Sequence, residues 1–121
     1  MGIKNFRDLN IWNIAIEIVE EIYLATKTFP KEELFGLSAQ MRRSSISVPS
    51  NIAEGFSRRY NKEYKQFLYI ALGSCSELAT QIVISHRLDF IERQKSENLV
   101  KKIDQVSRMI MSLIKCLDET K

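Results

Sequence analysis

An unbroken stripe of apolar residues near the end of the chain constrains its fold more than any other feature. The members of this stripe alternate at steps of four and three: Leu99, Ile103, Val106, Ile110, Leu113 and Leu117. These steps follow the roughly 3.6-residue period of an α-helix, whereas a strand would scatter the same residues over both of its faces. The stripe therefore predicts an amphipathic helix over about residues 93–118, which must pack its apolar face against other elements.

The rest of the chain has helical periodicity as well. We expect helices over about residues 9–28, 31–57 and 61–88. Phe29-Pro30 ends the first of these, because the residue before a proline resists the α conformation. Asn61 suits the N-cap of the third helix, and Asp89 suits its end because aspartate tolerates the left-handed conformation. Four helices with short connections predict an all-α fold, an antiparallel up-down-up-down four-helix bundle that forms one domain over residues 1–121.

Pro49 interrupts the pattern of the second helix. A proline there removes one backbone donor, and its ring crowds the carbonyl group of Ser45. We therefore predict that helix 31–57 is kinked at Pro49. Two helices broken at Pro49 are the alternative, but the unbroken apolar periodicity favours a single bent helix.

Composition and the first residues indicate a soluble protein. The 121 residues are 45% hydrophobic and 27% charged, close to the average for a globular domain. Residues 1–8 lack the apolar core of a signal peptide, and no run approaches the ~18 uncharged apolar residues of a membrane span. We therefore expect a cytoplasmic protein with no membrane partner. Cys75 and Cys116 lie in helical apolar patterns, so we expect two reduced core thiols rather than the disulfide that their number permits.

Residues typical of catalysis or metal binding are few. His86 is the single histidine, and Val83 stands where the Glu-x-x-His pattern of di-iron bundles requires a glutamate. No glycine-rich phosphate loop is present. These observations predict no enzymatic activity and no catalytic residue, cofactor, metal or small-molecule substrate. An enzyme with a site in the bundle core, around Glu54, Glu77 or His86, is the weakest alternative.

Positive charge is concentrated between residues 40 and 66. The whole chain has a net charge of +3, yet this segment alone holds six basic and two acidic residues. Its basic residues are Arg42, Arg43, Arg58, Arg59, Lys62 and Lys65. If the segment is helical at Arg58, the spacing to Lys62 and Lys65 makes one basic edge, with Tyr60 and Tyr64 interleaved. Such an edge suits RNA phosphates, and the tyrosines suit stacking on bases. A solvated surface with a buried Tyr64 is the commoner alternative.

A polar stripe runs beside the apolar face of the second predicted helix. Its members recur at steps of four and three: Gln40, Ser44, Ser47, Asn51, Glu54 and Arg58. A solvated face is the common outcome for such a stripe. The alternative is a hydrogen-bonded seam against Glu77 and Gln81 of the third helix, or against another subunit.

The first predicted helix has an unusually wide apolar face. Only a narrow strip is polar: Asn13, Glu17, Glu20, Glu21 and Thr28. An ordinary surface helix has a narrower apolar face than this. Either neighbours in the same domain bury the helix, or it also contacts another subunit.

The segment 40–56, QMRRSSISVPSNIAEGF, resembles the signature of a known family of four-helix bundles. These proteins are encoded in intervening sequences of bacterial large-subunit ribosomal RNA genes. Supporting matches are FRDL at 6–9 with Trp12, FPKEE at 29–33, FGL at 35–37, and ALGS at 71–74 with EL at 77–78. Asp89 departs from the pattern, because the family usually has glycine after the third helix.

The resemblance implies a non-enzymatic bundle, often described as ribosomal-protein-like. The family is also similar to the accessory protein of diversity-generating retroelements, a pentameric ring that uses basic surface to bind RNA and a reverse transcriptase. We therefore expect a homo-oligomer, a pentamer by this resemblance, that binds RNA. The expected contact residues are Arg58, Arg59, Lys62 and Lys65, joined by Arg42 and Arg43. The alternative is a protein–protein scaffold or adaptor with no nucleic-acid role.

Overall fold

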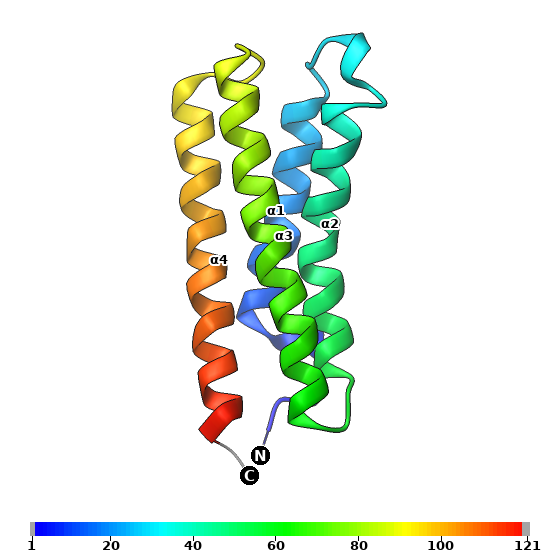
Figure 1. Cartoon of the computed structure of the whole chain (residues 1–121), viewed down its shortest axis with the longest axis vertical. Coiled ribbons are helices and arrows are strands. Elements are labelled where there is room, and N and C mark those ends of the chain that lie inside the picture. The colour runs from blue at the N-terminus through cyan, green and yellow to red at the C-terminus, as the bar shows by residue number, and fades with distance from the viewer. Residues whose placement is uncertain (1, 120–121) are drawn as a thin grey trace.

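Four long helices form an antiparallel bundle. The structure, a computed structural model, describes residues 2–119. Within this range the elements are two short 3₁₀ helices and four α-helices, with no strand: η1 (Phe6–Asp8), α1 (Asn10–Thr26), η2 (Lys31–Glu33), α2 (Leu37–Phe56), α3 (Asn61–Arg87) and α4 (Arg93–Glu119). Figure 1 shows consecutive helices running in alternating directions, so both ends of the described chain lie at the end of the bundle that holds the α2–α3 turn. The all-α four-helix fold is confirmed.

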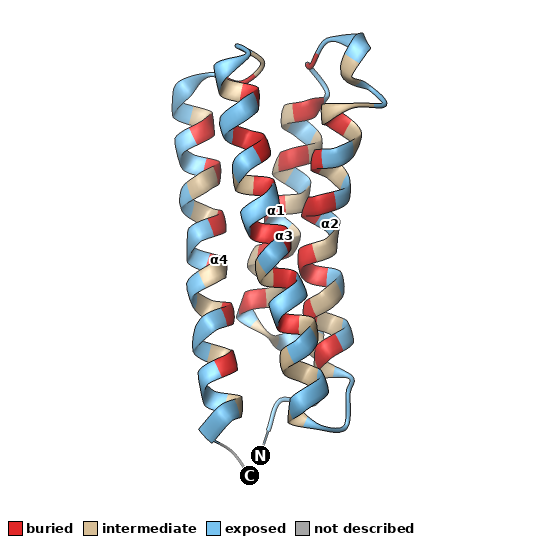
Figure 2. Ribbon diagram, in the orientation of Figure 1, coloured by how far each residue is buried: buried red, intermediate tan, exposed pale blue. Residues whose placement is uncertain are grey.

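Apolar side chains from all four helices meet in one core. Figure 2 shows that the buried residues of each helix face the inside of the bundle. From the predicted stripe of α4, four members are at most 2% exposed: Leu99, Ile103, Val106 and Ile110. Toward the end of α4 the buried position passes to Ile114, while Leu113 and Leu117 are partly buried. Each fully buried side chain of this size contributes roughly 1.5–3 kcal/mol, so this stripe is a main source of stability.

The second helix begins later than predicted. Lys31–Glu33 forms a separate 3₁₀ turn, and α2 begins at Leu37 rather than at residue 31. The reason is Gly36, whose φ of −109° and ψ of −113° are not helical. Glu33 then caps α2 from outside, because its Oε1 accepts a hydrogen bond from the Leu37 backbone N–H at 3.2 Å.

Pro49 lies inside an uninterrupted helix. The helix α2 spans Leu37–Phe56 and includes Pro49, so the alternative of two broken helices is wrong. Pro49 is itself buried. The kink expected at this residue stays a prediction.

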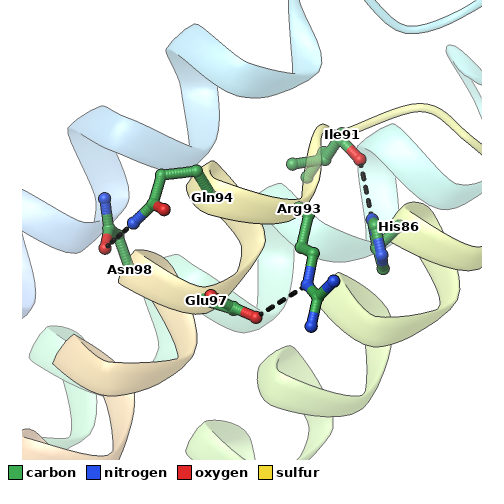
Figure 3. Close-up of polar contacts among 6 residues, drawn as sticks. All are labelled: His86, Ile91, Arg93, Gln94, Glu97 and Asn98. Carbon is green, nitrogen blue, oxygen red and sulfur yellow. Dashed lines mark hydrogen bonds and ion pairs between the residues drawn. The ribbon is translucent and has the colours of Figure 1, made fainter.

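The α3–α4 turn ends α3 in the predicted way. Asp89 has φ of 65°, and no other described non-glycine residue has a positive φ. The Phe90 N–H donates to the Ser85 carbonyl at 2.8 Å, and the Asp89 N–H donates to the His86 carbonyl at 2.9 Å. These two bonds are those of a Schellman motif, which satisfies the last carbonyl groups of a helix. The His86 Nδ1 atom lies 3.1 Å from the Ile91 carbonyl oxygen, so His86 also fastens the turn (Figure 3).

The prediction that Asn61 is the N-cap of α3 is wrong. The N-cap position belongs to Tyr60, which makes no side-chain capping bond. The Asn61 Nδ2 group instead donates to the Leu117 carbonyl of α4 at 3.3 Å. This side chain therefore connects the start of α3 to the end of α4, because the antiparallel arrangement places these two ends together.

Candidate nucleic-acid interface

The α2–α3 turn brings four of the predicted basic residues to one end of the bundle. Arg58 and Arg59 lie in the connection between α2 and α3, while Lys62 and Lys65 lie on the first turns of α3. The predicted helical edge is wrong at Arg58, because α2 ends at Phe56 and the Arg58 N–H closes a tight turn onto the Gly55 carbonyl at 3.0 Å. The four residues are neighbours through the turn rather than through a shared helix.

Two of these four cations already have acidic partners. The Arg58 Nη2 atom lies 3.2 Å from Glu54 Oε2, and its guanidinium group stacks on the Phe67 ring at 4.5 Å from the ring centre. Lys65 forms an ion pair with Asp118 near the end of α4. Both contacts compensate positive charge, so each of these two side chains attracts an anion more weakly than an unpaired cation does.

Among the described residues, Arg59 and Lys62 are the cations of the turn that no ion pair compensates, and they outnumber the one carboxylate in the first turn of α3, Glu63. Both side chains are exposed, and neither makes an ion pair within the described range 2–119. The Arg59 guanidinium lies 5.7 Å from the centre of the Tyr60 ring. Tyr60 is 60% exposed, so a cation and an open aromatic face are presented together. This pairing of groups is typical of surfaces that bind single-stranded nucleic acid.

Tyr64 is partly buried and packs within the bundle. Its ring packs edge-on against Phe56 with ring centres 6.2 Å apart. Gly55 permits this approach, because a Cβ atom there would lie 2.9 Å from Tyr64 Cδ1 and 3.1 Å from the Tyr64 carbonyl oxygen. Burial raises the pKa of the Tyr64 hydroxyl above its ordinary value of 10.0. Of the two interleaved tyrosines, Tyr60 is therefore the one exposed for stacking on a base.

Arg42 and Arg43 do not join the turn. They lie near the start of α2, and the roughly 15 residues to Arg58 correspond to about 22 Å of helix. Arg42 is engaged with α1: its Nε donates to Thr26 Oγ1 at 2.9 Å, and its guanidinium lies 4.5 Å from the centre of the Tyr23 ring. Arg43 is exposed. The six predicted residues therefore occupy two separate places.

The polar stripe of α2 forms a seam against α3. Ser44 Oγ donates to Gln81 Oε1 at 2.7 Å, and Ser74 Oγ donates to Ser47 Oγ at 2.8 Å. The Gln81 amide also donates to Glu77 Oε2 at 3.4 Å. The hydrogen-bonded alternative is thus confirmed at the centre of the stripe. Its outer members are exposed: Gln40, Glu54 and Arg58.

The exposed apolar surface lies on α3 rather than on α1. The structure describes all of α1, and the main apolar residues of this helix are buried within the bundle. Along this fully described helix, Leu24, 61% exposed, is the only large hydrophobic residue in the exposed class. On α3 four large side chains are 42–57% exposed: Tyr69, Ile70, Val83 and Ile84. Gly73 lies between them, and a Cβ atom there would meet nothing within 4 Å. We call these five residues the α3 face.

The helix α3 is also the one described helix that is long and apolar enough to cross a membrane, by length and composition alone. The most apolar 18-residue window of α3 has a mean hydropathy of 1.5, and 33% of that window is buried. The core helix of a soluble bundle can pass the same test, so this is weak evidence for a span. The helix contains Glu77 among its apolar residues, so it is not an uncharged apolar run of the kind that the sequence analysis looked for.

A second group of basic residues, which the sequence pattern did not predict, lines a groove of about 570 Å³ between α1 and α4. The lining residues are Glu21, Lys95, Asn98, Lys101, Lys102, Gln105 and Arg108. The net charge outside residues 40–66 conceals this group, because acidic residues on other faces cancel it in the sum. The available signal was the seven-residue spacing from Lys95 to Lys102 and from Lys101 to Arg108.

The two cysteines differ from each other. Cys75 is buried as predicted, and burial raises the pKa of its thiol. Cys116 is exposed, so its expected place in the core is wrong. The α4 helix turns this position outward, because the buried residue at this level is Ile114. Among residues 2–119, no three His, Cys, Asp or Glu side chains are grouped so that they could hold a metal ion.

Comparisons with known proteins agree with the fold. Residues 7–112 match the family model described as 23S rRNA-intervening sequence protein. The chain is also similar to the crystal structure, at 1.70 Å resolution, of a protein with unknown function from the S23 ribosomal protein family of Bacteroides thetaiotaomicron. That similarity has a TM-score of 0.78 at 22% sequence identity and covers 87% of this chain and 98% of the other. No curated protein matches the sequence.

Proposed function

The chain belongs to the family of 23S rRNA-intervening sequence proteins, and we propose that it is a non-enzymatic, homo-oligomeric accessory protein that binds RNA. The observation that carries the RNA proposal is the uncompensated positive charge of Arg59 and Lys62 beside the exposed ring of Tyr60. Cations of this kind bind phosphates without reading sequence, and the ring stacks on any base. We expect this activity in the cytoplasm.

The six predicted contact residues have graded roles in this proposal. Arg59 and Lys62 contact phosphates directly. Arg58 and Lys65 contribute by exchanging their carboxylate partners for phosphate, so their contribution is smaller. The remaining two residues are Arg42, whose contacts are with α1, and Arg43, which adds positive charge at a distance.

The α3 face supports the oligomeric part of the proposal. Apolar side chains that a single bundle leaves open are a common feature of subunit interfaces. Glycine in a helix interior costs about 0.5–1 kcal/mol relative to alanine, and no contact within the described bundle requires Gly73. A close approach by a second copy accounts for this residue. The proposed number of five subunits rests on the family resemblance.

RNA binding is tested with a pair of double variants that remove the same charge. Arg59→Ala with Lys62→Ala removes the proposed contacts, while Lys31→Ala with Arg87→Ala removes two exposed cations elsewhere. Loss of two phosphate contacts on single-stranded RNA lowers the slope of log affinity against log salt by about 1.4. Equal slopes for the two variants would disprove the assignment to the turn. Failure of the wild-type protein to bind RNA at low salt would favour the protein–protein scaffold.

Self-association is tested on α3 and α1 in parallel. Ile70→Glu places a charge on the α3 face, and Leu24→Glu places one on the open position of α1. Sedimentation velocity should show dissociation of the oligomer for Ile70→Glu and an unchanged oligomer for Leu24→Glu. The opposite result would assign the interface to α1, as the sequence pattern first suggested. A monomeric wild-type protein would refute the oligomer.

A further inference from the structure

The groove between α1 and α4 concentrates positive charge on one wall. The helix α4 contributes six of the seven lining residues, four of which are cations, and α1 contributes only Glu21. Glu21 is shared between two of them, with Oε1 at 3.6 Å from Lys95 Nζ and Oε2 at 2.5 Å from Lys102 Nζ. Lys101 and Arg108 are exposed and have no carboxylate partner within residues 2–119.

Other acidic residues near the groove do not cancel this charge. Glu17 of α1 is close enough to act on Lys102 electrostatically. Asp104 lies between Lys101 and Arg108 in sequence and lines a neighbouring pocket on the α3 side of α4, together with Glu97, Asn98 and Lys101. These two carboxylates flank the groove on that side. The lining of the groove itself holds four cations and one carboxylate, Glu21, so it keeps an excess of positive charge.

The spacing of the lining residues makes a regular ladder. Lys101 and Arg108 are seven residues apart, as are Lys95 and Lys102, which corresponds to about 10.5 Å or two helical turns. The ladder from Lys95 to Arg108 extends about 20 Å along α4. Cations distributed over this length suit an extended polyanion better than a single small anion.

Two amide side chains lie between the cations along α4. Asn98 and Gln105 are also seven residues apart and line the same groove. The Gln94 Nε2 group donates to Asn98 Oδ1 at 3.1 Å (Figure 3), so the Asn98 carbonyl oxygen is occupied and its NH₂ group is left to donate. Cations that alternate with amide donors suit the phosphate and sugar oxygens of a nucleic-acid backbone.

We propose that the α1–α4 groove is a second RNA-binding surface, which holds the phosphate backbone on the side of the bundle away from the α2–α3 seam. This inference rests on the proposed RNA-binding function. The described lining of the groove contains no aromatic or large apolar side chain that would anchor a protein segment, so its chemistry favours RNA over an acidic peptide. Arg108 supplies the bidentate phosphate contact, and the lysines supply point charges.

The test compares three double variants of the full chain on the same probe, a single-stranded RNA of about 30 nucleotides. Lys101→Ala with Arg108→Ala removes the two unpaired cations of the groove. Arg59→Ala with Lys62→Ala removes those of the turn, and Lys31→Ala with Arg87→Ala is the matched control, since each pair loses one lysine and one arginine. The groove pair should weaken binding about 25-fold at roughly 0.1 M salt and lower the salt slope by about 1.4.

The outcomes separate the groove from the proposed function. A groove pair that binds like the control pair, while the turn pair loses affinity, would overturn the groove and leave RNA binding in place. Equal losses in all three pairs would overturn it as well, since only total charge would matter. No RNA binding by the wild-type protein would overturn both proposals. Binding of polyglutamate by a protein that does not bind RNA would also overturn both. Loss of RNA affinity in the groove pair alone would support RNA binding at the groove and would refute RNA binding at the α2–α3 turn.

A substitution that should raise RNA affinity, rather than lower it, gives an independent test of the groove. Glu21→Gln releases Lys95 and Lys102 from their shared carboxylate, so each of the two lysines that then binds a phosphate should raise RNA affinity about fivefold at roughly 0.1 M salt. Bound RNA should also protect the amino groups of Lys95, Lys101 and Lys102 from acetylation, while Lys31 stays reactive. An unchanged affinity together with unprotected lysines would refute the groove.

Discussion

The two sides of the bundle are closed by different chemistry. On one side α2 and α3 approach through small side chains, and buried hydroxyl and amide groups bond directly across the contact, as in the pair Ser44 and Gln81. On the other side α1 and α4 leave a groove, bridged by the half-exposed ion pairs of Glu21. Buried hydrogen bonds are costly to disturb, whereas exposed ion pairs contribute little. Disturbing the polar contacts of the first side is therefore expected to cost more stability than breaking the ion pairs of the second, and ligand binding is expected on the second.

The largest loss of stability should come from Gly55 on the closed side. A side chain at this position must displace the Tyr64 backbone, whose carbonyl oxygen would lie 3.1 Å from the new Cβ. Gly55→Leu should lower the free energy of unfolding by about 3 kcal/mol, measured by chemical denaturation. The matched control is Gly73→Ala, which meets open space within a single bundle and, at protein concentrations where the chain is monomeric, should raise stability by about 0.5–1 kcal/mol. Equal effects would mean that α2 and α3 do not approach closely at Gly55.

The buried hydrogen bond of the seam gives the next largest effect. Gln81→Leu removes the partner of Ser44 across the contact, while the Ser44 hydroxyl keeps its 3.2 Å bond to the Met41 carbonyl, so the variant should cost about 1 kcal/mol of unfolding free energy. Adding Ser44→Ala to this variant should cost nothing further, because the remaining bond only joins Ser44 to its own helix. Gln94→Leu, at an exposed position on α4, should stay within about 0.5 kcal/mol of the wild type. A loss on adding Ser44→Ala would contradict this account of the seam.

Tyr64 makes the closed side sensitive to alkali. Its folded-state pKa lies above the unfolded value of 10.0 because burial disfavours the charged form. The stability it contributes is complete below pH 10.0 and is lost as the pH rises through the folded pKa. Spectroscopic titration of tyrosinate should therefore show a late step that Tyr64→Phe removes. A late step that persists in this variant would assign it to another tyrosine.

The smallest effect on stability should come from the open side. Glu21→Gln breaks both ion pairs yet should cost about 0.5 kcal/mol or less, with a further decrease at high salt. Hydrogen bonding to Glu21 raises the pKa of Lys102 above 10.5, so this contribution is present below pH 10.5 and is lost as the pH rises further. Denaturation at neutral and alkaline pH checks the sign. A loss as large as that of Gln81→Leu would remove the distinction between the two sides.

Periodicity was sufficient to predict the helices but not the details of their ends. The stripe of Leu99 to Ile110 and the left-handed Asp89 follow from local rules, since side-chain spacing and backbone preference act within a few residues. The late start of α2 does not, because it depends on the backbone of Gly36 and on a cap from Glu33. The prediction for Asn61 was wrong for the same reason: its partner, Leu117, is distant in sequence.

The candidate site was less predictable than the fold. Charge counting located Arg59 and Lys62, but it gave Arg58 and Lys65 the same weight. The four-residue spacing from Glu54 to Arg58 already permits the first ion pair, whereas Asp118, the partner of Lys65, is identified only in three dimensions. The seven-residue spacing of the α4 cations is visible in the sequence, but the groove is not, because Glu21 of a distant helix completes its lining. Sequence patterns describe the face of one helix, whereas a site depends on which helix lies opposite.

The even number of alternating helices has a practical consequence for experiments on this protein. Both ends of the described chain lie at the same end of the bundle as the α2–α3 turn (Figure 1). A purification tag or fluorescent protein joined to either end of the described chain starts at the end of the bundle that holds Arg59 and Lys62, where it competes for space with a bound polymer. A label at Phe35, 92% exposed in the α1–α2 connection at the opposite end, leaves the turn clear.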